Sequence, residues 1–148
     1  MRTARHLVVV ALAAILGCSG GSKPYKTAAV SGRVTLDGRP LAGARVTFQP
    51  VHDPQAGLMS GPEAHGVTDA DGNYALTTVF DDTGATIGRN RVMISTRRLE
   101  RPPHNPDGPL KEVASETVPN KYFTEKAPLY FDVPAGGTKA ANFELTGK

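Results

Sequence analysis

Apolar and polar residues alternate in seven short segments between residues 30 and 145, and this period of two is typical of half-buried β-strands. In the first segment, Val30, Val34 and Leu36 fall on one face, whereas Ser31 and Arg33 fall on the other. No stretch after residue 18 has the period of an amphipathic helix. The predicted strands cover residues 30–36, 44–50, 64–68, 73–78, 88–97, 129–133 and 141–145.

Turn residues separate these strands at short and similar intervals, which favours pairing between antiparallel neighbours. Glycine and proline are abundant, at 16 and 12 residues, and favour many turns over long helices. The pattern therefore predicts an all-β chain that folds as a single seven-stranded antiparallel β-sandwich. Its predicted core consists of the inward-facing apolar side chains, which are Val30, Val34, Leu36, Val46, Phe48, Tyr74, Leu76, Val92, Ile94, Leu129, Phe131, Val133, Phe143 and Leu145.

The strongest turn signal lies between the third and fourth predicted strands, at Asp69-Ala70-Asp71-Gly72-Asn73. An Asp-Gly pair between two apolar runs is typical of a β-hairpin, with the glycine at positive φ. We therefore expect the two strands to pair with each other across a structural turn at Asp71 and Gly72.

The same turn has an alternative interpretation as a weak calcium site. Asp69, Asp71 and Asn73 have the spacing of the first three ligands of an EF-hand loop. That loop needs a bidentate Glu at its twelfth position, which is Phe80 here, and its flanking segments are helices rather than strands. The turn is the favoured interpretation, and we expect no metal.

The longest segment without periodicity covers residues 99–119 and is rich in proline. A loop of this length inside a small domain is uncommon, and such loops are either functional or mobile. The sequence predicts an irregular loop here and leaves open whether it binds a partner or is only a mobile insertion.

The N-terminus has the layout of a targeting segment, with basic residues in 1–6 and an apolar run in 7–16. This run is too short to span a bilayer, which takes roughly 20 helical residues. It ends in Ile15-Leu16-Gly17-Cys18, which resembles the bacterial lipobox, and Cys18 is the only cysteine in the chain.

The lipobox resemblance implies that residues 1–17 are a signal peptide and that Cys18 is lipidated, with palmitate among its acyl chains. Residues 18–27 would then hold the lipidated cysteine and a flexible tether rich in glycine and serine. The expected location is the cell envelope, anchored to a membrane, with the domain facing the periplasm or the exterior. Ser19 favours the outer membrane under the enteric sorting rule. The alternative is an ordinary secretory signal.

Charge and candidate chemistry do not predict an enzyme. The net charge of +3 falls to +1 without the leader that carries Arg2 and Arg5, so we expect no nucleic-acid partner. The spacing of the histidines does not suit a zinc site, and no nucleophile–base motif is present. We therefore expect no cofactor and no catalytic residues, and treat an unrecognised site as the alternative.

Basic residues recur along the fifth predicted strand and just beyond it. Arg89, Arg91 and Arg97 share strand parity, and Arg98 follows directly. Such a stripe suits an anionic polysaccharide or another partner. The alternative is a solvated strand face that resists edge-to-edge aggregation.

The order of these motifs resembles the carboxypeptidase regulatory-like domain, which has a transthyretin-like (prealbumin-like) β-sandwich. Residues 118–122 and 142–145 add a resemblance to small lipoproteins of planctomycete-type bacteria that consist of this one domain. The residues that carry the domain pattern are Val30-x-Gly32-x-Val34, Asp37-Gly38-x-Pro40-Leu41-x-Gly43-Ala44-x-Val46-x-Phe48, Thr68-Asp69-x-Asp71-Gly72-x-Tyr74-x-Leu76 and Gly84-Ala85-x-x-Gly88 before Val92-x-Ile94.

The resemblance implies that residues 28–148 form one monomeric, non-catalytic module at the cell surface or in the periplasm. Its expected partners are the membrane, through the lipid anchor, and an envelope protein or polysaccharide. Two alternatives stay open: a purely structural envelope lipoprotein without a specific ligand, and an accessory subunit of an extracytoplasmic enzyme.

Overall fold

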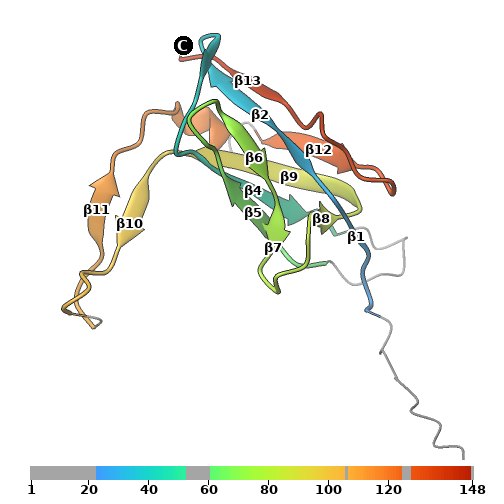
Figure 1. Ribbon diagram of the computed structural model, residues 1–148, viewed down its shortest axis with the longest axis horizontal. Coiled ribbons are helices and arrows are strands. Elements are labelled where there is room, and N and C mark those ends of the chain that lie inside the picture. The colour runs from blue at the N-terminus through green and yellow to red at the C-terminus, as the bar shows by residue number, and fades with distance from the viewer. Residues whose placement is uncertain (1–22, 53–60, 106, 125–127, 148) are drawn as a thin grey trace, which may run out of the picture.

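The computed structural model describes residues 23–52, 61–105, 107–124 and 128–147. Within them the chain is all-β, as predicted, apart from one short 3-10 helix, η1 (Asn120–Tyr122). Two sheets pack on one apolar core (Figure 1). The larger sheet is antiparallel throughout, and its strand order is β12 (Leu129–Val133), β9 (Gly88–Ser95), β4 (Arg45–Pro50), β5 (Ala64–Val67) and β7 (Thr77–Thr78).

The second sheet is built around β2 (Ser31–Leu36). On one side, β2 pairs with β3 (Arg39–Pro40) and β6 (Asn73–Ala75), and on the other with β13 (Phe143–Leu145). The β13–β2 pair is parallel, so the prediction of a purely antiparallel arrangement is wrong at this edge. The reason is that the chain crosses from β12 in the larger sheet to β13 in the second, so no hairpin sets the direction of the last strand.

The predicted hairpin around the central turn is also wrong. β5 pairs with β4 and β7, whereas β6 pairs with β2, so the turn carries the chain from one sheet to the other. β5 and β6 pass so close together that a Cβ on Gly66 would overlap the carbonyl oxygen of Ala75. The predicted fourth strand also splits at Leu76 into β6 and β7, which belong to different sheets.

The core confirms the predicted inward faces, since every residue of the predicted set is buried or packs half-buried against the cluster. Phe48, Phe131 and Phe143 form its centre, with ring centroids 5.7 to 6.2 Å apart. Phe48 comes from the larger sheet and Phe143 from the second, so this contact joins the two layers. Beside it, the Tyr74 hydroxyl donates to the carbonyl oxygen of Ala141 at 2.6 Å, and burial raises the pKa of Tyr74.

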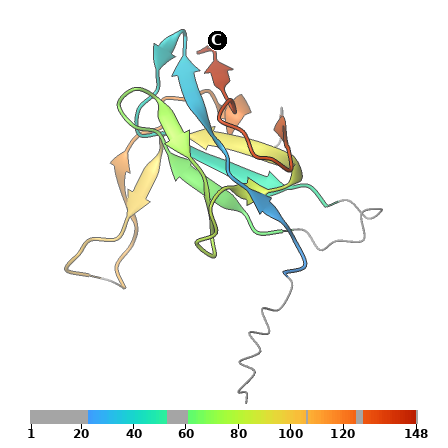
Figure 2. The ribbon, with the colours of Figure 1, turned by 45° about the vertical axis from the view of Figure 1, so that its right-hand side comes forward.

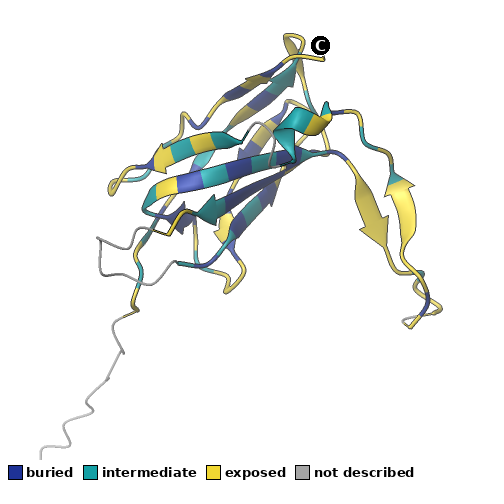
Figure 3. Cartoon of the chain, turned by 180° about the vertical axis from the view of Figure 1, so that it is seen from behind, coloured by how far each residue is buried: buried dark blue, intermediate teal, exposed yellow. Residues whose placement is uncertain are grey.

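A short pair of strands projects from the sandwich. β10 (Arg98–Glu100) and β11 (Lys111–Ala114) form an antiparallel hairpin, which we call the arm, and it stands away from the sheets in both views (Figures 1 and 2). Figure 3 shows its strands as almost entirely exposed. The prediction of an irregular loop over 99–119 is therefore wrong, because two strands this short, with one shift of register, are too brief for alternation to be recognised.

Candidate functional site

The lipidation candidate Cys18 and residues 1–17, the predicted signal peptide, lie outside the described residues. The described chain begins with Lys23, whose Nζ lies 2.5 Å from Asp82 Oδ1. This hydrogen bond raises the pKa of Lys23 above its usual value. A few residues later, β1 (Thr27–Ala28) pairs with β8 (Ala85–Thr86), so these two contacts fix the point where the chain joins the sandwich. Among the described residues, no helix is long and apolar enough to cross a membrane.

The calcium candidates form a turn in which one oxygen of Asp69 already has backbone partners. Asp69 Oδ1 accepts hydrogen bonds from the backbone N–H groups of Asp71 and Asn73, at 2.9 and 2.8 Å. Gly72 donates from its N–H to the carbonyl oxygen of Asp69 and has φ +79°, as the sequence predicts for this position. The described residues contain no group of three or more His, Cys, Asp or Glu side chains that could hold a metal ion. The turn interpretation accounts for every contact of Asp69.

The candidate arginines do not form one face. Arg89 and Arg91 lie on the outer side of the larger sheet, where Arg89 stacks over the Tyr130 ring at 4.4 Å and Arg91 donates to Gln49 at 2.7 Å. β9 ends at Ser95, so the predicted alternation of faces along this strand does not extend to Arg97 and Arg98.

Arg97 lies just before the arm and Arg98 is the first residue of β10, and both have acidic partners on the arm. Arg97 Nε lies 2.8 Å from Glu112 Oε2, and Arg98 Nε lies 2.9 Å from Glu100 Oε1. These partners neutralise both charges. The predicted basic stripe is therefore two separate pairs of arginines in different environments.

The root of the arm contains the densest polar network of the described chain, centred on Glu116. Its carboxylate accepts from the Ser95 hydroxyl and from the N–H and hydroxyl of Thr96, the last two at 3.0 and 2.9 Å. It also accepts from the N–H groups of Thr117 and Val118. Glu116 thereby ties the chain entering the arm to the chain leaving it.

The pKa of Glu116 reflects the same contacts. Partial burial alone would raise the pKa, but the hydrogen bonds from Ser95, Thr96 and Val118 outweigh it and leave the pKa below its usual 4.5. A carboxyl whose folded pKa is depressed contributes stability above its unfolded pKa and loses it as the pH falls through the folded value. We therefore expect ionised Glu116 to stabilise the root of the arm at neutral pH and to lose this effect only in acid, below pH 4.5.

Replacing Glu116 by Gln should lower the free energy of unfolding by about 1–3 kcal/mol at neutral pH, because charge-assisted hydrogen bonds are lost. Denaturant titrations of the unmodified protein and of Glu116→Gln measure this difference in the free energy of unfolding. The difference should disappear as the pH falls below 4.5. The pKa of Glu112 is also lowered, by hydrogen bonds from Ser115 and Arg97, but this group is present in both proteins and cancels. A difference that stays constant into acid would contradict the assignment.

A pocket opens beside this network, where the arm meets the sandwich. Its volume is about 470 Å³, and it is lined by Ser95, Arg97, Glu112, Ser115, Glu116 and Phe123. Of these residues, only Arg97 stood out in the sequence. Three of the six lie in the stretch that lacks periodicity, and the pairing of β10 with β11 brings this stretch back to Ser95 and Arg97.

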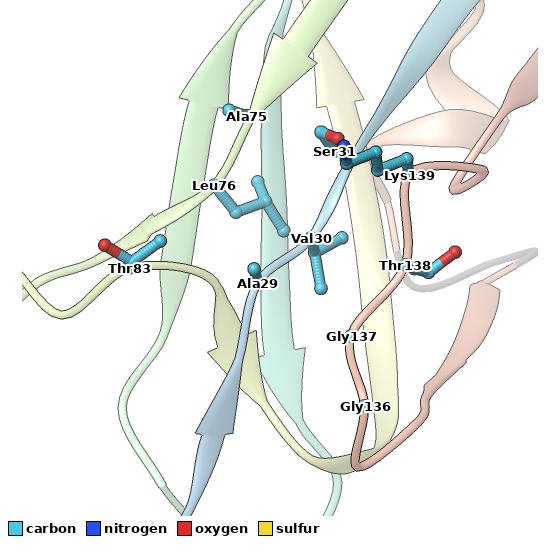
Figure 4. A pocket seen from close by; sticks show the side chains of 10 residues that line it. All are labelled: Ala29, Val30, Ser31, Ala75, Leu76, Thr83, Gly136, Gly137, Thr138 and Lys139. Atoms are coloured by element: carbon cyan, nitrogen blue, oxygen red, sulfur yellow. The ribbon is translucent and has the colours of Figure 1, made fainter.

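Another pocket among the described residues holds about 370 Å³ between residues 29–31, residues 75–76, Thr83 and the loop 136–139 (Figure 4). The Leu76 side chain points toward Val30, and both residues are buried. The hydroxyls of Thr83 and Thr138 point away from these two side chains. This pocket therefore offers a ligand few polar groups.

Fold and pockets together define an all-β protein with a projecting hairpin arm and a polar pocket at the root of the arm. Comparison with known proteins adds no family to this description, since no family model and no curated protein matches the chain. Among solved structures, a 9R-lipoxygenase from Cyanothece PCC8801 is similar over 85% of this chain and 17% of the lipoxygenase chain, with 14% identity and a TM-score of 0.38. A likeness at that TM-score says nothing about the fold or activity of this protein.

Proposed function

We propose that the protein is a lipid-anchored, non-catalytic module of the bacterial cell envelope that contacts an envelope protein or polysaccharide. The observation that carries this proposal is the arm. Leu99, Leu110 and Val113 are 42%, 52% and 47% exposed on it, far from the core cluster. Apolar side chains placed there add nothing to the packing of the sandwich, so a contact role explains them better than a structural one.

The arm is also held in position at its root. A two-stranded hairpin is only marginally stable on its own, and here the Glu116 network fastens both of its ends to the sandwich. A segment that is fixed before binding loses less conformational entropy when a partner arrives. This arrangement supports a preformed contact element.

The finer class follows from the order of motifs. We propose that residues 28–148 form a carboxypeptidase regulatory-like domain of the transthyretin-like type. Two of the Asp-Gly pairs that carry the resemblance fall on tight turns, with φ +50° at Asp37, +77° at Gly38 and +79° at Gly72. Such turns support the motif as a fold signature, since Asp and Gly are the residues that accept positive φ.

The anchor is tested by replacing Cys18 with Ser. We expect the protein to move from the membrane fraction to the soluble fraction and to lose palmitate labelling, because the serine cannot take a thioether-linked lipid. Ser22→Ala is the matched control and should stay in the membrane fraction with its label. Retention of Cys18→Ser in the membrane fraction would refute the anchor.

The contact role is tested by a pull-down from detergent-solubilised membranes with the full chain. The unmodified protein should capture a stoichiometric partner, and a double variant that carries both Leu99→Ser and Val113→Ser should fail to capture it. Val67→Ser is the control, because Val67 is similarly exposed, at 52%, on β5 of the sandwich. Equal capture by all three proteins would argue against the arm as the contact element.

A further inference from the structure

The pocket at the root of the arm combines paired charges with an aromatic side chain. Arg97 and Glu112 lie side by side in its lining as an ion pair, with side chains 55% and 40% exposed, and Phe123 contributes the apolar wall. Its volume of about 470 Å³ lies within the range of ligand-binding pockets, roughly 300–1,000 Å³. The pocket is therefore open, of adequate size and chemically mixed.

The charged pair has hydrogen-bonding capacity to spare. Arg97 uses Nε for Glu112, and its two Nη groups have no partner among the described residues. Glu112 accepts from Arg97 through Oε2 and from the Ser115 hydroxyl through Oε1 at 2.9 Å, so about two of its lone-pair positions are unused. The pocket thus presents N–H donors and carboxylate acceptors side by side.

The remaining lining groups are committed to the fold. The Ser95 hydroxyl donates to Glu116 Oε2, and Glu116 Oε1 accepts from Thr96, Thr117 and Val118, so most of the acceptor positions of this carboxylate are occupied. Glu116 therefore acts on a ligand mainly through its negative charge, which disfavours an anion. Since Arg97 and Glu112 neutralise each other, the pocket carries no net positive charge that would attract an acidic group.

We infer that this pocket binds a sugar unit of a neutral polysaccharide, and this inference rests on the proposed contact function. Neighbouring hydroxyls of a sugar ring are each donor and acceptor, which matches the guanidinium of Arg97 beside the carboxylate of Glu112. The C–H face of the ring is apolar and packs against Phe123. Because Glu112 belongs to β11 and Phe123 follows η1, the sugar would bridge the arm and the sandwich.

The test is calorimetric titration of the full chain in detergent with neutral hexasaccharides, namely cellohexaose, xylohexaose and maltohexaose, and with oligogalacturonate as the acidic probe. We expect at least one neutral probe to bind, and Arg97→Ala and Glu112→Ala each to weaken its binding about tenfold. Phe123→Leu, which keeps an apolar side chain, should weaken it less. Arg98→Ala is the matched control, because Arg98 is the next residue along the chain and pairs with Glu100 instead.

Three outcomes would overturn the inference. They are the absence of binding by every neutral probe, tighter binding of oligogalacturonate, and unchanged binding in both Arg97→Ala and Glu112→Ala. Melting curves of the variants show whether each is folded before its titration is interpreted. The proposed function fails separately, in the pull-down with arm variants, so a captured protein partner without sugar binding would reject the saccharide while leaving the contact role in place.

Discussion

Replacing Phe48 by alanine is expected to lower the free energy of unfolding by about 3–5 kcal/mol, the range for large-to-small changes at fully buried aromatic positions. Phe48 is completely buried and contacts both Phe131 and Phe143, at ring-centroid distances of 5.7 and 6.2 Å. Truncation removes the ring that joins the two sheets and leaves a cavity that neighbouring rings fill only in part.

The matched control is Phe80→Ala. Phe80 has the same side chain but is 66% exposed, so its removal should change the free energy of unfolding by less than about 0.5 kcal/mol. Urea denaturation of the three proteins measures both effects. Similar stabilities for Phe48→Ala and Phe80→Ala would contradict the placement of Phe48 at the centre of the core.

Replacing Gly72 by alanine is expected to cost roughly 2–5 kcal/mol, from two effects of about 1–2 and 1–3 kcal/mol. The first is strain, because φ is +79°. The second is steric, because a Cβ on Gly72 would overlap the carbonyl oxygen of Val34 and crowd the N–H of Leu41 at 3.3 Å. The Val34 oxygen accepts the hydrogen bond of that same N–H, so neither group moves without breaking it.

Gly38→Ala separates the two effects. Gly38 has nearly the same φ, +77°, but no atom lies within 4 Å of the position that a Cβ would take. Its substitution should therefore cost only the strain of about 1–2 kcal/mol. Equal melting temperatures for the two variants would show that the Gly72 turn does not pack against β2 as described.

The faces of the strands could be predicted from the sequence, because alternation depends only on which side of a strand a residue occupies. Val46, Phe48, Val92 and Ile94 are examples, and all four are buried. The partners of the strands could not be predicted in the same way. Asn73 to Leu76 alternates identically whether it pairs with β5 or with β2, and the close approach of β5 to β6, at Gly66, involves a residue without a side chain.

The candidate site was harder to predict for a related reason. Glu112 and Glu116 lie in a proline-rich stretch without periodicity, and their roles depend on contacts with Ser95, Thr96 and Arg97 across the base of the arm. Nothing in the local pattern indicates that these two segments meet. The arginines show the opposite error. Alternation along one strand predicted that Arg97 shares a face with Arg89, although β9 ends before Arg97.

The parallel β13–β2 pair has a consequence for how the protein matures. β2 is the middle strand of its sheet, and next to the β13 pairing the N–H of Arg33 bonds to Asn142, 109 residues further along the chain. A chain that emerges from its N-terminus must keep β2 incomplete until its last residues are available. Long sequence separation between contacts slows folding, so the backbone edge of β2 that β13 covers would remain open to misassociation for most of synthesis. Truncation of only the last few residues would then mimic an unfinished chain rather than trim a dispensable tail.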